Sequence, residues 1–137
     1  MQGFFITGTD TGVGKTHVSC VLLHQLQQRG LMAVGLKPVA SGAVQTSAGL
    51  RNEDVLLLQH HSSCLNDHHV PDYEALNVYT FAAAVAPHIA AAQQGVEMQL
   101  EPIVKQAKSW APRVDCMLVE GVGGWLVPLN SRQTLAD

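Results

Sequence analysis

The sequence predicts an α/β domain in which helices cover both faces of a mainly parallel sheet, a three-layer α/β/α arrangement. A short apolar run at residues 3–7, typical of a buried parallel strand, is followed by a glycine-rich turn and by a helical pattern over residues 15–28. A second apolar run, residues 33–37, completes a βαβ unit, and a third run lies at residues 115–119. The charged fraction of 14% suits strands that are covered on both faces.

The remaining elements follow from periodicity and from glycine and proline. We expect the helix at residues 15–28 to end at Gly30 and the strand at residues 33–37 to close at Pro38. Residues 38–52 predict a loop because they are rich in Gly, Ser, Ala and Thr, and helices are expected at residues 53–60, 87–94 and 100–110. The first helix is expected to pack through four apolar residues at helical spacing: Val18, Val21, Leu22 and Leu26.

Composition disfavours several classes of partner. The formal charge is -3, and the eight Lys and Arg residues are scattered, so no nucleic-acid partner is expected. We find no apolar run of membrane-spanning length and no signal peptide, which argues against a membrane partner. The three cysteines form no C-x-x-C pair, and we expect a reducing, cytoplasmic location.

The most informative motif is Gly-Thr-Asp-Thr-Gly-Val-Gly-Lys-Thr at residues 8–16, between a predicted strand and a predicted helix. In such a P-loop, backbone N–H groups and the helix N-terminus surround phosphate oxygens. Lys15 can reach the terminal phosphates, and the Thr16 hydroxyl can ligate Mg²⁺. Five residues separate Gly8 from Gly14, one more than in the usual motif. The alternative is a glycine-rich turn with an incidental Lys-Thr pair.

This motif makes the fold P-loop NTPase-like and residues 1–137 a single nucleotide-binding α/β domain. Doubly wound sheets usually have about five strands or more, and three or four are readable here. We therefore expect an N-terminal portion of a longer domain, incomplete at its C-terminus.

Polar residues at strand ends extend the candidate site. Glu120 ends the third apolar run, where an acid can complete the coordination of nucleotide-bound Mg²⁺, although an exposed turn glutamate is an equal alternative. Lys37 ends the second run, with Ser41 in the following loop, and it can hold an anion or be a solvated lysine. Asp54 lies in the first turn of a predicted helix, where the helix dipole alone favours an acid.

The seven histidines include the adjacent pairs His60–His61 and His68–His69. We disfavour a metal site there because adjacent histidines seldom converge on one metal and no carboxylate or cysteine accompanies them at ligand spacing.

Taken together, these segments resemble the dethiobiotin synthetase family over nearly the whole chain. The matching blocks are residues 7–16, 37–42, 49–54, 77–81, 87–89 and 119–125. The resemblance implies an enzyme that converts 7,8-diaminopelargonate, CO₂ and ATP to dethiobiotin, ADP and phosphate through a carbamate and a carbamic-phosphoric anhydride. It also implies Mg²⁺, a homodimer when the chain is complete, and further C-terminal residues that recognise adenine.

The resemblance also implies roles for individual residues. Lys37 and Lys15 would stabilise the carbamate and the transferring phosphoryl group, with Thr11 and Ser41 near the substrate. Thr16, Asp54 and Glu120 would serve Mg²⁺. The chain departs from some members at Gly12, where they carry glutamate, and at Ala84, where proline is familiar. The residues implied to bind ATP are Gly12, Val13, Gly14, Lys15, Thr16, His17, Asp54, Glu120, Gly121, Val122 and Gly123.

Three alternatives stay open at this point. A switch ATPase of the partitioning class shares the fold, but many such proteins carry a lysine early in the P-loop where this chain has Asp10. The synthetase half of a cobyrinate-type amidotransferase would need a glutaminase domain for which this chain has no room. A truncated, inactive synthetase is the third alternative.

Overall fold

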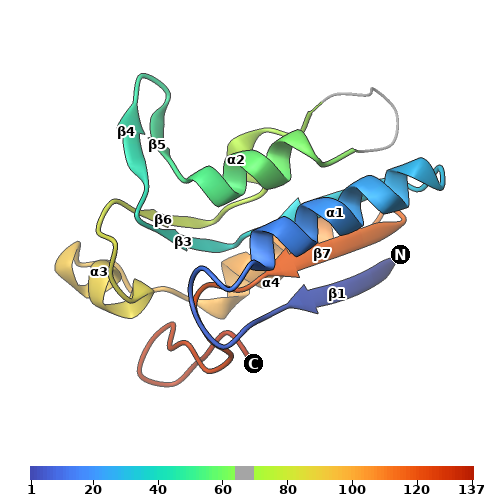
Figure 1. Cartoon of the computed structure of the whole chain (residues 1–137). Coiled ribbons are helices and arrows are strands. Elements are labelled where there is room, and N and C mark those ends of the chain that lie inside the picture. The colour runs from blue at the N-terminus through green and yellow to red at the C-terminus, as the bar shows by residue number, and fades with distance from the viewer. Residues whose placement is uncertain (64–69) are drawn as a thin grey trace.

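The computed structural model describes residues 1–63 and 70–137, and its centre is a three-stranded parallel sheet (Figure 1). The strands β1 (Gln2–Ile6), β7 (Cys116–Glu120) and β2 (Ala33–Leu36) run in the order β1-β7-β2. In the register, Ile6 pairs with Glu120 and Leu36 pairs with Val119. The three carboxyl ends therefore lie along one edge, where α/β sheets place ligands.

Helices cover both faces of this sheet, which confirms the predicted three-layer class. α1 (Lys15–Gln28) and α2 (Glu53–His60) pack on one face, where Leu23 and Leu58 meet Cys116 and Leu118. α4 (Leu100–Trp110) covers the other face through Trp110, and Figure 1 shows it behind β7 while α1 passes in front. Successive strand residues point to opposite faces, so each apolar run supplies both layers.

The predicted loop at residues 38–52 is wrong, because three short strands lie there. β3 (Val39–Ser41) pairs in parallel with β6 (Tyr79–Phe81), while β4 (Val44–Thr46) and β5 (Gly49–Arg51) form an antiparallel hairpin. All three residues of β4 are exposed, so the hairpin has little of the apolar alternation by which strands are recognised. A short 3-10 turn (Tyr73–Ala75) and α3 (Pro87–Gln93) complete the described elements.

Two predicted core surfaces are also wrong. β1 was expected to be buried, yet its residues 2–5 are exposed, and among the described strands β1 has β7 as its one neighbour. On α1, Val18 is 50% exposed, and Val21 and Leu22 are exposed as well, whereas Leu26 packs against the core as expected. The helix instead turns its Lys15, Ser19 and Leu23 face inward.

No described helix has both the length and the apolar character needed to cross a bilayer.

Candidate nucleotide and magnesium site

The P-loop connects β1 to α1, as the motif predicted. Gly12 and Gly14 have φ values of 77° and 100°, a left-handed conformation that side chains disfavour. Gly8 is needed for a different reason, because a side-chain carbon there would lie 2.6 Å from Val13 Cγ2. Gly14 caps α1 without a side-chain hydrogen bond, so the helix N-terminus presents backbone N–H groups that can bind an anion.

Lys15, the first residue of α1, is buried within the loop. Its ammonium donates to the backbone carbonyl oxygen of Asp10 at 2.6 Å. Asp10 is held in turn by its own side chain, since Oδ1 accepts the Thr11 backbone N–H at 2.7 Å. The lysine thus bridges the loop through a neutral acceptor, and its charge remains available for a phosphate.

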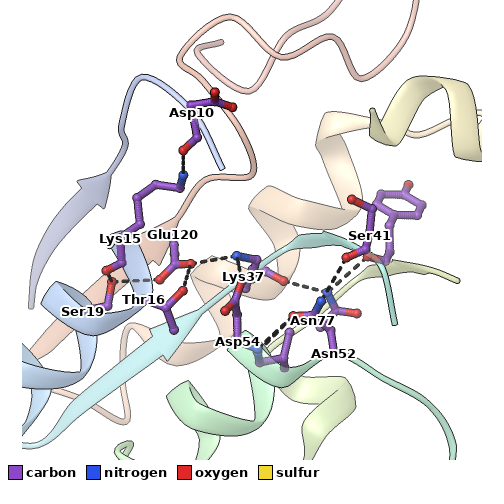
Figure 2. A network of polar contacts seen from close by, with 12 residues as sticks. Asp10, Lys15, Thr16, Ser19, Lys37, Ser41, Asn52, Asp54, Asn77 and Glu120 are labelled. Atoms are coloured by element: carbon purple, nitrogen blue, oxygen red, sulfur yellow. Dashed lines mark hydrogen bonds and ion pairs between the residues drawn. The ribbon is translucent and has the colours of Figure 1, made fainter. Parts of the chain in front are cut away.

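A second cation, Lys37, lies between two carboxylates at the same edge of the sheet (Figure 2). Lys37 directly follows β2, and its Nζ donates to Asp54 Oδ2 at 2.6 Å and to Glu120 Oε1 at 2.7 Å. Lys37 is 4% and Glu120 1% exposed, whereas the Asp54 side chain is 40% exposed. The three residues come from the end of β2, the start of α2 and the end of β7, and we call them the carboxylate cluster.

Two hydroxyl groups on α1 also contact the Glu120 carboxylate. Thr16 Oγ1 donates to Glu120 Oε1 at 2.7 Å. Ser19 Oγ lies 3.0 Å from Glu120 Oε2 and 2.9 Å from the Lys15 carbonyl oxygen, so its proton can serve either acceptor. Sequence reasoning missed Ser19, which is fully buried. Its position one helical turn after Lys15, on the same face, is the signal that could have found it.

A buried polar frame positions the backbone on which the cluster stands. Asn52 caps α2 by accepting the backbone N–H groups of Asp54 and Val55 at 3.1 and 3.4 Å, and its Nδ2 donates to the Ser41 carbonyl at 3.1 Å. The Tyr73 hydroxyl accepts the Asn52 backbone N–H at 2.9 Å. Asn52 stands directly before a predicted helix, the usual place of an N-cap, so the sequence signal was present.

Asn77 extends this frame to Lys37. Its Nδ2 donates to the Lys37 carbonyl oxygen at 2.7 Å, and its Oδ1 accepts a hydrogen bond from Thr80. The Lys37 backbone N–H donates to the Leu76 carbonyl at 2.9 Å. Both backbone polar groups of Lys37 are therefore held by residues 76 and 77, which fixes the start of its side chain.

These parts enclose one cavity of about 320 Å³. Among the predicted site residues, Val13 and Gly121 do not line it. Val13 is 52% exposed, and Gly121 packs toward the Phe5 ring. The phosphate cavity, as we call it, is lined by Thr11, Gly12, Gly14, Lys15, Thr16, His17, Lys37, Ser41, Asp54, Glu120, Val122 and Gly123.

A second cavity of about 400 Å³ adjoins the first and shares its Thr11, Ser41, Val122 and Gly123 walls. Its other walls come from the segment before α3, from the first two residues of α3 and from the C-terminal residues. They are largely apolar: Ala84, Val85, Ala86, Pro87, His88, Val127 and Pro128. We call it the side cavity.

The donor atoms of the phosphate cavity suit Mg²⁺. Thr16, Asp54 and Glu120 offer a hydroxyl and two carboxylates, the hard oxygen ligands that Mg²⁺ prefers beside nucleotide phosphates. The Lys37 ammonium already binds to both carboxylates, which shows that this position attracts a cation.

Burial, and then the negative charges of Glu120 and Asp54, raise the pKa of the nearby Cys20 thiol.

The adjacent histidines His60 and His61 lie at the end of α2. The His60 and His61 rings lie with centroids 5.1 Å apart, and burial, followed by the charges of His60 and His24, lowers the pKa of His61. Within residues 1–63 and 70–137, no group of three or more His, Cys, Asp or Glu side chains is placed to hold a metal ion. The pair His68–His69 lies outside the described residues.

Comparison with known proteins agrees with this geometry. The family model described as AAA domain matches residues 2–137. A protein named ATP-dependent dethiobiotin synthetase BioD from Xylella fastidiosa strain Temecula1 is 50% identical over 131 residues, covering 96% of this chain and 56% of the relative. A protein of the same name from Xanthomonas axonopodis pv. citri is 49% identical over 134 residues, covering 98% of this chain and 58% of the relative. The resemblance inferred from the separated motifs is thus confirmed, and the chain spans about half the length of the curated relatives it matches.

Proposed function

The chain belongs to the AAA domain family, and from this premise we propose that it forms the phosphate- and magnesium-binding part of an ATP-dependent dethiobiotin synthetase. One observation carries the proposal. Two buried lysines, Lys15 and Lys37, line one cavity, and the two carboxylates that line it as well have the chemistry of a magnesium site. Transfer of phosphate between two anionic reactants needs this concentration of positive charge.

In the proposed reaction, an amine of diaminopelargonate attacks CO₂ and loses a proton, giving a carbamate. A carbamate oxygen then attacks the γ-phosphorus of ATP, and the bond to the ADP oxygen breaks. The second amine attacks the carbamoyl carbon, the ureido ring closes, and phosphate leaves. No covalent bond to the protein is needed, so positioning and charge neutralisation supply the rate.

Each residue of the phosphate cavity has a part in this scheme. The P-loop backbone from Gly12 to His17 surrounds the triphosphate, and Lys15 leaves the Asp10 carbonyl to contact the terminal phosphates. Thr16, Asp54 and Glu120 would hold Mg²⁺, which would supply charge neutralisation for the phosphate oxygens. Lys37 stabilises the carbamate and the transferring group, and residues 120–123, including Gly121 and Val122, contribute to the nucleotide side.

The side cavity supports the choice of substrate. Thr11 and Ser41 stand where it meets the phosphate cavity and can hydrogen-bond the amines. Its apolar walls suit the aliphatic chain of diaminopelargonate. We propose that the amines lie at this junction, next to Lys37, with the chain directed into the side cavity.

The test is product formation. The protein is incubated with Mg-ATP, bicarbonate and diaminopelargonate, and dethiobiotin is measured by mass spectrometry. We expect product from the intact enzyme that contains this chain and none from its Lys37→Gln variant, which should still bind ATP. ATP hydrolysis that is independent of diaminopelargonate, with no dethiobiotin formed, would favour a switch ATPase instead.

The proposal also includes a cytoplasmic homodimer, which rests on the family resemblance. Light scattering coupled to size-exclusion chromatography measures the mass in solution. If the measured mass is that of one chain at concentrations at which dethiobiotin is formed, the dimer is refuted. The proposed reaction is not affected by that result.

A further inference from the structure

The two oxygens of the buried Glu120 carboxylate have different surroundings. Among the described residues, Oε2 has the Ser19 hydroxyl of α1 as its hydrogen-bond partner, at 3.0 Å. Oε1 accepts from both Thr16, at 2.7 Å, and the Lys37 ammonium, at 2.7 Å. A carboxylate oxygen has two lone pairs, so the described partners already use both of those on Oε1.

The same ammonium bridges to Asp54. Lys37 Nζ lies 2.6 Å from Asp54 Oδ2, and the Asp54 side chain is 40% exposed. The proposed magnesium ligands are thus the very acceptors that the ammonium uses. A divalent cation and an ammonium repel each other strongly when both lie within a few ångströms of one buried carboxylate. The two cannot share Glu120 Oε1 at full affinity.

We propose that Lys37 and the divalent cation compete for Asp54 and Glu120, so that loading of the cation releases the Lys37 ammonium toward the phosphate cavity. Ser19 is a positioning residue in this exchange. Its hydroxyl holds Oε2 while Oε1 changes partners, so the Glu120 carboxylate keeps its orientation. Before loading, the ammonium balances charge that would otherwise be buried unpaired, which is costly.

This inference deepens the proposed function, since it rests on the magnesium site assigned there. It gives Lys37 two successive duties. Without the divalent cation the lysine is a counter-ion within the carboxylate cluster, and with the cation it is free to meet an anionic substrate. The Lys37 ammonium would therefore stay bound to the carboxylates, and away from the substrate, until the divalent cation binds.

Binding of Mn²⁺ without nucleotide tests the competition directly, because Mn²⁺ accepts the same oxygen ligands as Mg²⁺. Free Mn²⁺ is followed by electron paramagnetic resonance during titration of the unchanged protein, Lys37→Gln, Lys37→Arg and Lys105→Gln. We expect Lys37→Gln to bind about tenfold more tightly than the unchanged protein, because the competing charge is gone. Lys37→Arg keeps the charge, and Lys105→Gln removes an exposed one on α4, so both should bind like the unchanged protein.

The role of Ser19 is measured in the Lys37→Gln background, where binding is strongest. Adding Ser19→Ala should weaken Mn²⁺ binding several-fold, the opposite direction to the lysine change. Thermal unfolding of each variant verifies the fold. As a measurement on the unchanged protein, saturating Mg²⁺ should raise the reductive methylation of the Lys37 amine, read by mass spectrometry, while that of Lys105 stays constant.

Equal Mn²⁺ affinity of Lys37→Gln and the unchanged protein would contradict the proposed competition. The same holds if the extent of Lys37 methylation does not change when Mg²⁺ is added. Synthesis of dethiobiotin by the unchanged protein would leave the proposed function standing in either case. Failure of the unchanged protein to bind Mn²⁺ even with ATP would overturn the proposed function, and this inference with it.

Discussion

The P-loop and the carboxylate cluster each bury one lysine, and the partners of the two lysines differ. Lys15 is 8% exposed and donates to a backbone carbonyl within its own loop. Lys37 is 4% exposed and donates to two carboxylates from distant elements. One lysine is held by a neutral dipole and the other by two opposite charges.

This difference decides how each lysine can be used. The Lys15 ammonium attracts a charged phosphate oxygen more strongly than it attracts a neutral carbonyl oxygen. Lys15 can therefore bind an anion without a prior change elsewhere in the site. Lys37 must give up two ion pairs, and leaving two carboxylates without a cation is costly. The P-loop can therefore act alone, whereas the carboxylate cluster needs a second cation before its lysine is free.

Removal of Glu120 should break the cluster with the largest effect on stability. Glu120→Ala leaves Lys37 with a single partner and takes the shared acceptor away from Thr16 and Ser19. We expect the free energy of unfolding to fall by about 3 kcal/mol, typical of breaking a buried pair. Urea unfolding measures it. Asp54→Ala is the matched control and should cost less, because that side chain is 40% exposed. Equal losses would contradict the asymmetry within the cluster.

Replacement of Lys15 should separate binding from stability. Lys15→Met removes one hydrogen bond to a carbonyl, so we expect the free energy of unfolding to change by less than about 1.5 kcal/mol. ATP affinity should fall about a hundredfold, because a charge-assisted contact to phosphate is lost. Titration with a fluorescent ATP analogue measures the affinity. Lys37→Met, run alongside, should keep ATP affinity within a few-fold; a loss equal to that of Lys15→Met would erase the contrast between the two lysines.

The same contrast explains what the sequence could predict. The P-loop is contiguous, so its glycines, Lys15 and Thr16 were found from one motif, together with the helix that begins at Lys15. Glu120 and Lys37 could be placed at strand ends, but they are 83 residues apart. Their contact depends on β7 pairing with β2, which no local pattern reveals. Asp54 was grouped with them only through the family resemblance.

Errors in the predicted core have a related cause. The apolar periodicity of α1 pointed to four residues, of which the structure packs only Leu26 against the core and exposes the other three: Val18, Val21 and Leu22. Periodicity identifies an apolar face but does not say what covers it. The inward face of α1 instead carries Lys15 and Ser19, because it serves the site at the end of β7. Polar residues at buried positions are where pattern reasoning fails and where function is found.

A smaller effect is expected from the frame that supports Lys37. Asn77→Ala removes the donor to the Lys37 carbonyl and the acceptor for Thr80, so we expect about 2 kcal/mol lower stability and about tenfold slower dethiobiotin synthesis. Urea unfolding and the rate at saturating ATP measure the two effects. Tyr73→Phe, which removes only a hydroxyl, should cost about half as much stability. Unchanged synthesis by Asn77→Ala would show that Lys37 needs no such support.

The smallest effect is expected at Cys20, whose thiol reports the charge of the carboxylate cluster. Burial raises the pKa of this thiol first, and the negative charges of Glu120 and Asp54 raise it further. A higher pKa leaves less thiolate at a given pH, and the thiolate is the reactive form, so alkylation should be slower than for a free thiol. Glu120→Gln removes one of those charges, lowers the pKa of Cys20 and should speed alkylation about two- to threefold. Mass spectrometry of the Cys20 peptide distinguishes it from the other cysteines.

The control is Lys15→Met, which leaves both carboxylates in place and should not speed the alkylation of Cys20. Equal acceleration in both variants would mean that Cys20 reports loosening of α1 rather than the charge of the carboxylate cluster.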